Sequence, residues 1–117
     1  MEHDPRAWLW DVCQAADRVA EFVGGQGFAD YLADVKLRSA IERQLEIVGE
    51  ALNNLSREAP ELASRIPDAR RAIAMRNVLI NAYRNIDNDA VWQTIQVDLP
   101  RLRLEAAALL AELGEVP

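Results

Sequence analysis

The residues best suited to chemistry lie in the stretch MRNVLINAYRNID at positions 75–87. It brings Arg76, Asn77, Asn81 and Tyr83 together within a short length of chain. An arginine is suited to binding phosphate, because its planar guanidinium presents several N–H donors. On an uninterrupted helix Arg76 and Tyr83 are nearly eclipsed, whereas Asn81 lies roughly 140° around the axis from Arg76. A site that uses both Arg76 and Asn81 therefore requires a break in the helix or a second copy of the chain across a two-fold axis.

The chain is acidic overall but basic around these residues. It has 13 basic and 19 acidic residues and a net charge of −6, which argues against an indiscriminate nucleic-acid binder. From position 65 to position 84, five arginines stand against the single acidic residue Asp68, a local charge of +4 that leaves −10 for the rest. The five are Arg65, Arg70, Arg71, Arg76 and Arg84. This basic run coincides with the residues suited to chemistry.

Other common kinds of site lack the residues they need. His3 and Cys13 are the only histidine and cysteine, and they lie apart near the N-terminus, so no metal site and no cofactor is expected. The glycines of GGQG at 24–27 follow a predicted helix instead of a strand, which indicates a helix end and not a phosphate-binding loop. The longest apolar run, 106–111, is too short to cross a membrane. A single cysteine forms no internal disulfide, and we therefore expect a cytoplasmic protein.

The spacing of the apolar residues predicts an all-α fold in a single domain over residues 1–117. Apolar residues recur three and four positions apart, which lines one face of a helix, and no alternating strand pattern is present. We expect four or five helices, most simply in an antiparallel bundle. The first is expected from Asp4 to Gly24, and the second from about Phe28 to Pro60 without a break. One helical turn or a structured loop is expected between Pro60 and Pro67. Further helices are expected from Asp68 to about 85–88, and from Asp87 onward with a kink at Pro100.

Three stretches between residues 40 and 104 resemble one protein family. They are AIERQLEIVGEALNNLS, MRNVLINAYRNID and VWQTIQVDLPRL, in this order. Together they resemble the HepT-like branch of the HEPN domain family over more than half of the chain. The family signature is an arginine, a polar residue, a few intervening positions, a histidine and, in this branch, a tyrosine two residues later. Arg76, Asn77 and Tyr83 match the signature, whereas Asn81 occupies the position of the histidine.

The resemblance implies an all-helical homodimer in which two copies of the motif face each other across a cleft and cleave RNA without a metal. Such proteins usually act as the toxin of a bacterial toxin–antitoxin pair, and the antitoxin is a small MntA-like nucleotidyltransferase. Carried over to this chain, Arg76 binds and neutralises the scissile phosphate, Asn77 supports it, and Tyr83 accepts AMP from the antitoxin. The implied partners are a second copy of the chain, RNA and the nucleotidyltransferase.

Asn81 bears directly on the expected mechanism. In metal-free cleavage the ribose 2′-hydroxyl attacks the adjacent phosphate, which requires a group that takes up its proton. Asparagine forms hydrogen bonds but does not titrate, and the loss of a general base typically costs about 10²–10⁴ in rate. The chain is therefore expected to be a slow nuclease, an inactive one or a variant made inactive.

Other interpretations of the same residues stay open. Arg76 is also suited to pairing with a helix carboxylate at the surface, and Tyr83 to packing in the core. The tryptophans are expected in the core or at an interface between copies, not as platforms for bases: Trp8, Trp10 and Trp92. Besides a ribonuclease, the sequence is compatible with a non-catalytic HEPN module that binds a nucleotidyltransferase or a nucleotide. A plain helical interaction protein is the third hypothesis.

Overall fold

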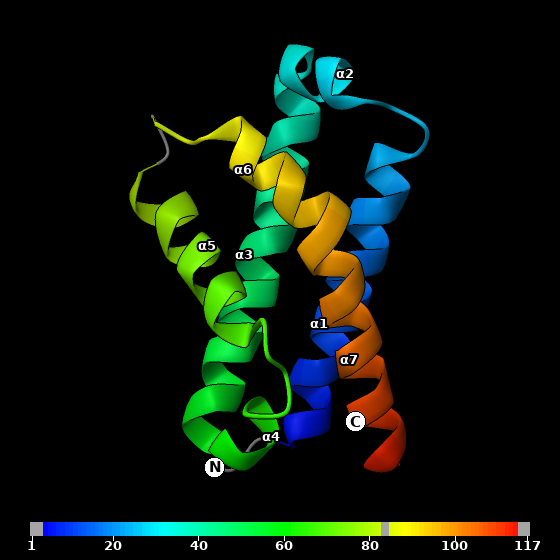
Figure 1. Ribbon diagram of the computed structural model, residues 1–117, viewed down its shortest axis with the longest axis vertical. Helices are drawn as coiled ribbons and strands as arrows, with labels where there is room; N and C mark the ends of the chain where they lie inside the picture. The colour runs from blue at the N-terminus through cyan, green and yellow to red at the C-terminus, as the bar shows by residue number, and fades with distance from the viewer. Residues whose placement is uncertain (1–3, 83–84, 115–117) are drawn as a thin grey trace.

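The computed structural model describes residues 4–82 and 85–114, and the structural statements below concern these residues. Four helical arms form an antiparallel bundle (Figure 1): α1 (Pro5–Val23), α3 (Val35–Glu58), α5 (Ala69–Asn81), and a fourth arm made of α6 (Asn88–Gln93), the π-helix η1 (Thr94–Asp98) and α7 (Leu99–Glu112). Two short helices connect them: α2 (Phe28–Ala33) and α4 (Pro60–Ala63). No strand occurs within these two ranges, and the predicted all-α bundle is confirmed.

The helix ends follow local chemistry where the sequence signals are strong. The Asp4 carboxylate accepts a hydrogen bond from the Arg6 amide at 2.9 Å, and a proline fills the first position of α1. The helix ends at Gly24, whose φ of 54° favours glycine. Asp87 caps α6 in the same way, because its side chain accepts from two backbone amides. The expected start and end of the first helix, the single turn after Pro60 and the cap at Asp87 are confirmed.

Two expected helix boundaries are wrong. The long second helix is broken at Asp34, whose backbone is extended and whose side chain accepts from the amides of Lys36 and Leu37. This residue therefore ends α2 and caps α3. The helix expected to reach 85–88 ends at Asn81, with Ala82 as its C-cap.

The expected kink before Pro100 takes the form of a π-helix. Pro100 is the second residue of α7 and has no backbone N–H, so it interrupts the hydrogen bonding of the preceding turn. The wider turn of η1 accommodates this interruption, since π-helical turns occur mainly as local insertions within α-helices. The Thr94 hydroxyl donates to the Ala90 carbonyl at 2.9 Å at the junction of α6 and η1.

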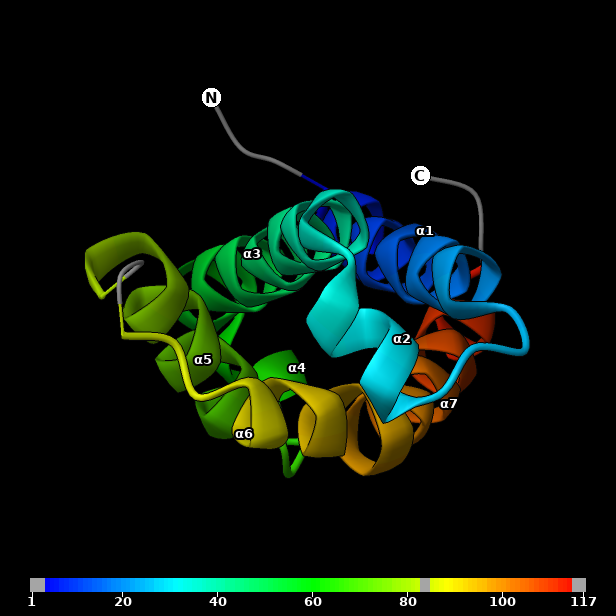
Figure 2. The ribbon, with the colours of Figure 1, turned by 90° about the horizontal axis from the view of Figure 1, so that it is seen from above.

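The core is built around α3. This helix packs against both α1 and α5, and α1 in turn packs against α7 (Figure 2). One face of α3 is fully buried, as Ile41, Leu52 and Leu55 show. The position of α5, which carries the motif residues, is therefore set mainly by its contact with α3.

The tryptophans divide between the core and the surface. Trp8 is buried, and Trp92 packs with its ring centroid 5.7 Å from that of Phe28 and 5.4 Å from that of Tyr31. Trp10 is 43% exposed, so a core position is wrong for this residue. Its placement at an interface between copies stays a prediction.

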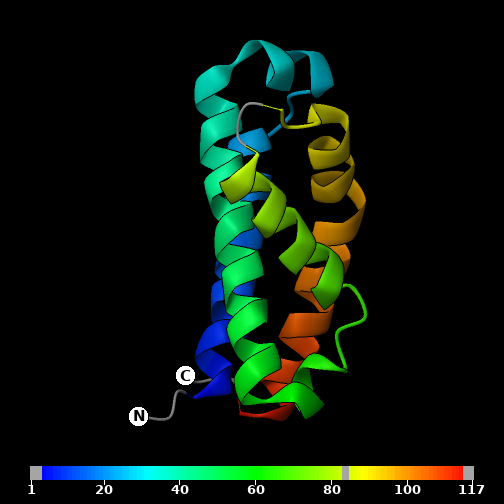
Figure 3. The ribbon, with the colours of Figure 1, turned by 90° about the vertical axis from the view of Figure 1, so that its left-hand side faces the viewer.

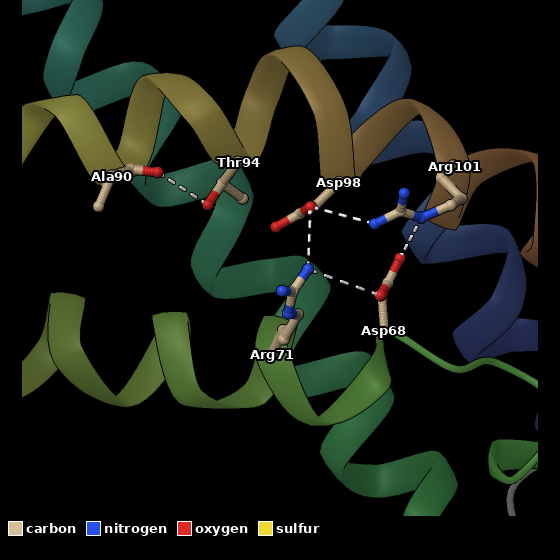
Figure 4. A network of polar contacts seen from close by, with 6 residues as sticks. All are labelled: Asp68, Arg71, Ala90, Thr94, Asp98 and Arg101. Atoms are coloured by element: carbon tan, nitrogen blue, oxygen red, sulfur yellow. Dashed lines mark hydrogen bonds and ion pairs between the residues drawn. The ribbon is translucent and has the colours of Figure 1, made fainter.

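A network of four ion pairs holds the start of α5 against the fourth arm (Figure 4). Asp68 precedes α5 and is 8% exposed, and its carboxylate pairs with Arg101 on α7 at 2.5 Å. Arg71 on α5 lies 3.4 Å from Asp98 and 4.0 Å from Asp68. Asp98 also pairs with Arg101 at 3.2 Å. Ion pairs therefore fix the start of α5, and packing against α3 fixes the rest of the helix.

Candidate functional site

Helix α5 crosses α3 at a glycine (Figure 3). Gly49 is buried in α3, and a Cβ atom at this position would lie 2.2 Å from the Arg76 Cβ and 2.8 Å from the Ala72 carbonyl oxygen. Neither separation is compatible with a side chain at position 49, because nonbonded carbon atoms pack about 3.5–4.0 Å apart. The glycine therefore allows the two helices to approach closely, and this places Arg76 directly against α3.

Arg76 is held by a carboxylate and an amide. Its Nη2 atom lies 2.6 Å from Oε2 of Glu50 on α3, and its Nη1 atom donates to Oδ1 of Asn77 at 3.0 Å. The Arg76 side chain is 27% exposed, so it is fixed but reachable from solvent. A guanidinium carries five N–H donors, and two contacts leave several of them for a phosphate. The surface pairing considered for Arg76 is confirmed, and it leaves room for an anionic ligand.

Asn77 links the arginine to Asn81. While the Asn77 side chain accepts from Arg76, its main-chain carbonyl accepts a hydrogen bond from Nδ2 of Asn81 at 2.8 Å. Both asparagines are exposed, and Asn81 is the last residue of α5. The helix is unbroken between Arg76 and Asn81, so these two side chains leave it in different directions. Tyr83 lies outside the described residues.

The basic run is largely neutralised by carboxylates from other parts of the chain. Arg65 lies 2.6 Å from Glu112, and Arg71 and Arg76 have the partners described above. Arg70 has no ion-pair partner among residues 4–82 and 85–114. Arg84 lies outside the described part of the chain. The local charge of +4 expected from the sequence is therefore not a free basic patch, because distant acids fold onto it.

Glu50 is the site residue that sequence reasoning missed. It lies on the charged face of α3, which in the sequence resembles an ordinary solvated surface. The signal that could have found it is the neighbouring Gly49, since a glycine inside a long helix often marks a close approach of another backbone. The carboxylate that follows such a glycine is well placed to meet a cation on the crossing helix.

A groove between α1 and α3 lies beside Glu50. It has a volume of about 180 Å³, and its charged lining residues are Asp11, Arg43, Glu46 and Glu50. Burial raises the pKa of the Asp11 carboxyl, which Arg18 partly offsets. Glu50 is paired with Arg76 and Glu46 with Arg43, which leaves the Asp11 carboxylate and no free cation in the lining, so this groove does not favour an anion.

The described residues offer few other reactive groups. Among positions 4–82 and 85–114, no three His, Cys, Asp or Glu side chains gather where they could hold a metal ion. Cys13 is half-buried on α1 beside the Arg103 carbonyl, and burial raises the pKa of its thiol. No helix of the described chain is long and apolar enough to span a bilayer. The chemistry available at the α3–α5 crossing is therefore phosphate binding and hydrogen bonding by Arg76, Asn77 and Asn81.

The sequence matches a known family over most of its length. The family model described as "Ribonuclease HepT-like" matches residues 12–109. This range contains α3, α5 and every motif residue described above. No solved structure matches the chain significantly.

Curated relatives come from bacteria and archaea. A protein of Thermococcus cleftensis named "Probable ribonuclease HepT" is 35% identical over 103 residues, which cover 88% of this chain and 93% of that protein. A protein of Caldanaerobacter subterraneus subsp. tengcongensis named "Putative RNase" is 34% identical and covers 91% of this chain and 94% of its own. A further "Putative RNase", from Methanocaldococcus jannaschii, is 29% identical over 89% of this chain and 94% of its own.

Proposed function

The chain belongs to the HepT-like ribonuclease family, and we propose that it is the endoribonuclease toxin of a bacterial toxin–antitoxin pair, which cleaves RNA without a metal ion. The observation that carries this proposal is the arrangement of Arg76. Its guanidinium is fixed by Glu50 and Asn77 and yet reachable from solvent, at the position of the family arginine. RNA is the proposed ligand because the relatives are named as probable or putative ribonucleases and because an arginine binds a phosphodiester.

The proposed cleavage uses the RNA's own hydroxyl as nucleophile. The 2′-hydroxyl gives its proton to a water molecule, and its oxygen forms a bond to the adjacent phosphorus. The bond from phosphorus to the 5′-oxygen breaks, and this oxygen takes a proton from water, which leaves a 2′,3′-cyclic phosphate and a 5′-hydroxyl. Negative charge develops on the phosphoryl oxygens, and Arg76 stabilises it through donors that Glu50 and Asn77 leave free. Asn77 keeps the guanidinium oriented toward the phosphate. Glu50 is a positioning residue in this scheme, since it touches Arg76 and not the RNA.

Asn81 limits the rate of this reaction. Its amide donates to the Asn77 carbonyl and provides no group that takes up the proton of the 2′-hydroxyl. A histidine at this position would supply such a group with a pKa near neutrality. The native chain is therefore a slow or silent nuclease.

The active form in this proposal is a homodimer. Arg76 and Asn81 leave α5 in directions roughly 140° apart, so one copy does not converge them on a single phosphate. Val78 and Ile80 lie beside them on the same helix and are 46% and 43% exposed. These two side chains point roughly 160° apart, so a second copy packed against one side of this region would cover one of them and bring one copy's arginine toward the other copy's position 81.

The proposed antitoxin is an MntA-like nucleotidyltransferase that transfers AMP from ATP to the hydroxyl oxygen of Tyr83. Pyrophosphate leaves, and the phenolic proton passes to solvent. Support comes from the family motif, in which a tyrosine stands two residues after the histidine position. The transfer would add an anionic phosphodiester seven residues from Arg76, where it would compete with RNA for the arginine. Intact-mass measurement of the chain co-expressed with a nucleotidyltransferase encoded beside it tests the step, and an unchanged mass contradicts it.

The decisive experiment restores the missing base. RNA cleavage is measured for the native chain, Asn81→His, Asn81→His with Arg76→Ala, and Asn81→His with Arg65→Ala, each shown by sedimentation to have the same oligomeric state. We expect Asn81→His to cleave about 10²–10⁴ times faster than the native chain. Arg76→Ala should abolish the gain, whereas Arg65→Ala, which removes an arginine paired with Glu112, should keep it. Equal activity of the two arginine variants would contradict the role of Arg76.

The absence of a titratable group at position 81 favours a second candidate, a non-catalytic HEPN module that binds a nucleotidyltransferase or a nucleotide. Its prediction differs in the same experiment. All four chains would fail to cleave RNA, while the native chain would still bind its partner in sedimentation or calorimetry.

A further inference from the structure

The exposed face of α5 extends from the motif asparagines toward the start of the helix. Arg70, Ala74, Asn77 and Asn81 are all exposed. At 100° per residue, these four positions lie within roughly 60° of one another around the helix axis. At about 1.5 Å per residue, Arg70 is about 10 Å along the axis from Asn77. One continuous exposed face therefore joins the motif asparagines to an arginine near the other end of the helix.

A surface cavity opens beside Arg70. Its volume is about 350 Å³, and it is formed where the end of α3, the helix α4 and the start of α5 meet. The polar side chains that line it are Arg70, Ser56 and Ser64, and the remainder of the lining is apolar. This volume lies at the lower end of the range of about 300–1,000 Å³ that is usual for small-ligand sites, and it suits a single nucleotide unit.

The positive charge in the lining of this cavity favours an anionic ligand. Its lining contains one cation and no carboxylate. Arg65, Arg71 and Arg76 of the same basic run are already paired with acids, whereas Arg70 has no such partner within the described ranges. The groove beside Glu50 is the opposite case, because acids dominate its lining. An incoming phosphate at Arg70 would therefore meet an uncompensated positive charge.

We propose that this cavity binds a backbone phosphate of the RNA strand, at a distance from the phosphodiester that Arg76 holds, and that Arg70 is its cation. The inference rests on the proposed function, because it gives the ribonuclease a second contact with its substrate. The strand lies along the exposed face of α5 from the cavity to Asn77 and Asn81. Arg76 stands roughly 120° around the helix from Arg70, so the strand turns around α5 to reach it. Arg70 is too far from the reacting phosphate to act in the chemistry, so its contribution is to affinity.

The test measures binding and does not depend on catalysis. A fluorescein-labelled RNA oligonucleotide and a dinucleotide, both with 2′-O-methyl groups that block cleavage, are titrated with the native chain, Arg70→Ala, Arg70→Lys and Arg65→Ala. Fluorescence anisotropy gives Kd over a series of salt concentrations. Arg70 is exposed, so its replacement should leave the fold intact. Arg65→Ala is the matched control, because it removes the same charge from an arginine outside the cavity lining.

We expect Arg70→Ala to weaken oligonucleotide binding about fivefold at low salt and to reduce the slope of log affinity against log salt by about 0.7, the value of one phosphate contact on a single strand. Arg70→Lys should retain most of the affinity. The dinucleotide is too short to reach both the cavity and the motif, so it should bind the native chain more weakly than the oligonucleotide does. Identical Kd values and salt slopes for Arg70→Ala and Arg65→Ala would overturn the inference.

The outcome also separates this inference from the proposed function. If Asn81→His cleaves RNA but Arg70→Ala binds like the control, only the phosphate site at Arg70 is refuted. If the native chain binds neither RNA and Asn81→His cleaves none, the proposed function fails and the site at Arg70 fails with it.

Discussion

Replacing Gly49 by alanine tests whether the close crossing of α3 and α5 positions the site. The added methyl carbon would lie 2.2 Å from the Arg76 Cβ and 2.8 Å from the Ala72 carbonyl oxygen. Relief of the first contact alone requires the helices to separate by about 1.3 Å, since carbon atoms pack no closer than about 3.5 Å. Both neighbours are atoms at or next to the backbone, so a side-chain rotation does not remove the overlap.

Two opposing terms set the expected change in the free energy of unfolding. Overpacking a well-packed contact costs about 1–3 kcal/mol. Alanine is favoured over glycine in a helix interior by about 1 kcal/mol. Because this overlap involves main-chain atoms, we place its cost at the upper end and expect a net loss of about 2 kcal/mol.

Urea unfolding followed by circular dichroism measures this loss. With a slope of about 2 kcal/mol per M, the midpoint of Gly49→Ala should fall by about 1 M. All measurements use one protein concentration, because the stability of the proposed dimer would depend on concentration. Gly25→Ala is the control: a Cβ atom there meets nothing within 4 Å, and its midpoint should stay close to the native value.

A midpoint of Gly49→Ala at or above that of the native chain would refute this reasoning. It would mean that helix propensity outweighs the steric cost and that α5 moves away from α3 without penalty. The position of Arg76 over α3 would then not depend on the glycine.

Two further changes probe charges, one at the site and one away from it. In the Asn81→His background, Glu50→Gln should lower kcat about tenfold with little change in KM, because Arg76 loses its orientation and not its access to RNA; an unchanged kcat would contradict this. The Arg103 guanidinium lowers the pKa of Asp17, so this carboxylate stabilises the fold above its unfolded pKa and loses that effect as pH falls through its lower folded pKa. Asp17→Asn should therefore cost about 0.2–1 kcal/mol at pH 7, and urea titrations should show the difference from the native chain vanishing at strongly acidic pH; a difference that is constant with pH would contradict the pairing.

Local signals in the sequence predict much of the fold. Asp4 and Asp87 are N-caps that precede apolar repeats. Gly24 ends α1 and Pro60 begins α4, each for steric reasons that hold in any context. The break at Asp34 escapes the same reasoning, because apolar residues continue at helical spacing on both sides of it. In the sequence, Asp34 resembles any other charged surface residue. Only the structure shows that its side chain accepts hydrogen bonds from the amides of Lys36 and Leu37.

The candidate site is predicted in its residues but not in its surroundings. Arg76, Asn77 and Asn81 stand out because their types and order suit phosphate chemistry, and the structure places them at one end of α5. Their electrostatic environment depends on acids far along the chain, since Glu50 pairs with Arg76 and Glu112 with Arg65. A count of charges over residues 65–84 predicts a free basic patch. In the folded chain, acids from other segments pair with most of these arginines.

The role of each arginine in binding an anion depends on whether a carboxylate is paired with it. Arg76 is paired with Glu50, which lowers its attraction for a distant anion but fixes the direction in which its remaining donors point. Arg70 lacks a described partner and has a cavity beside it, so it attracts a phosphate without orienting one as strictly. In the proposed ribonuclease, which is acidic overall, the two arginines have different roles: the paired Arg76 orients the reacting phosphate, and the unpaired Arg70 adds affinity for the strand. The two kinds of variant should then separate in kinetics, with Glu50→Gln acting on kcat and Arg70→Ala acting on KM.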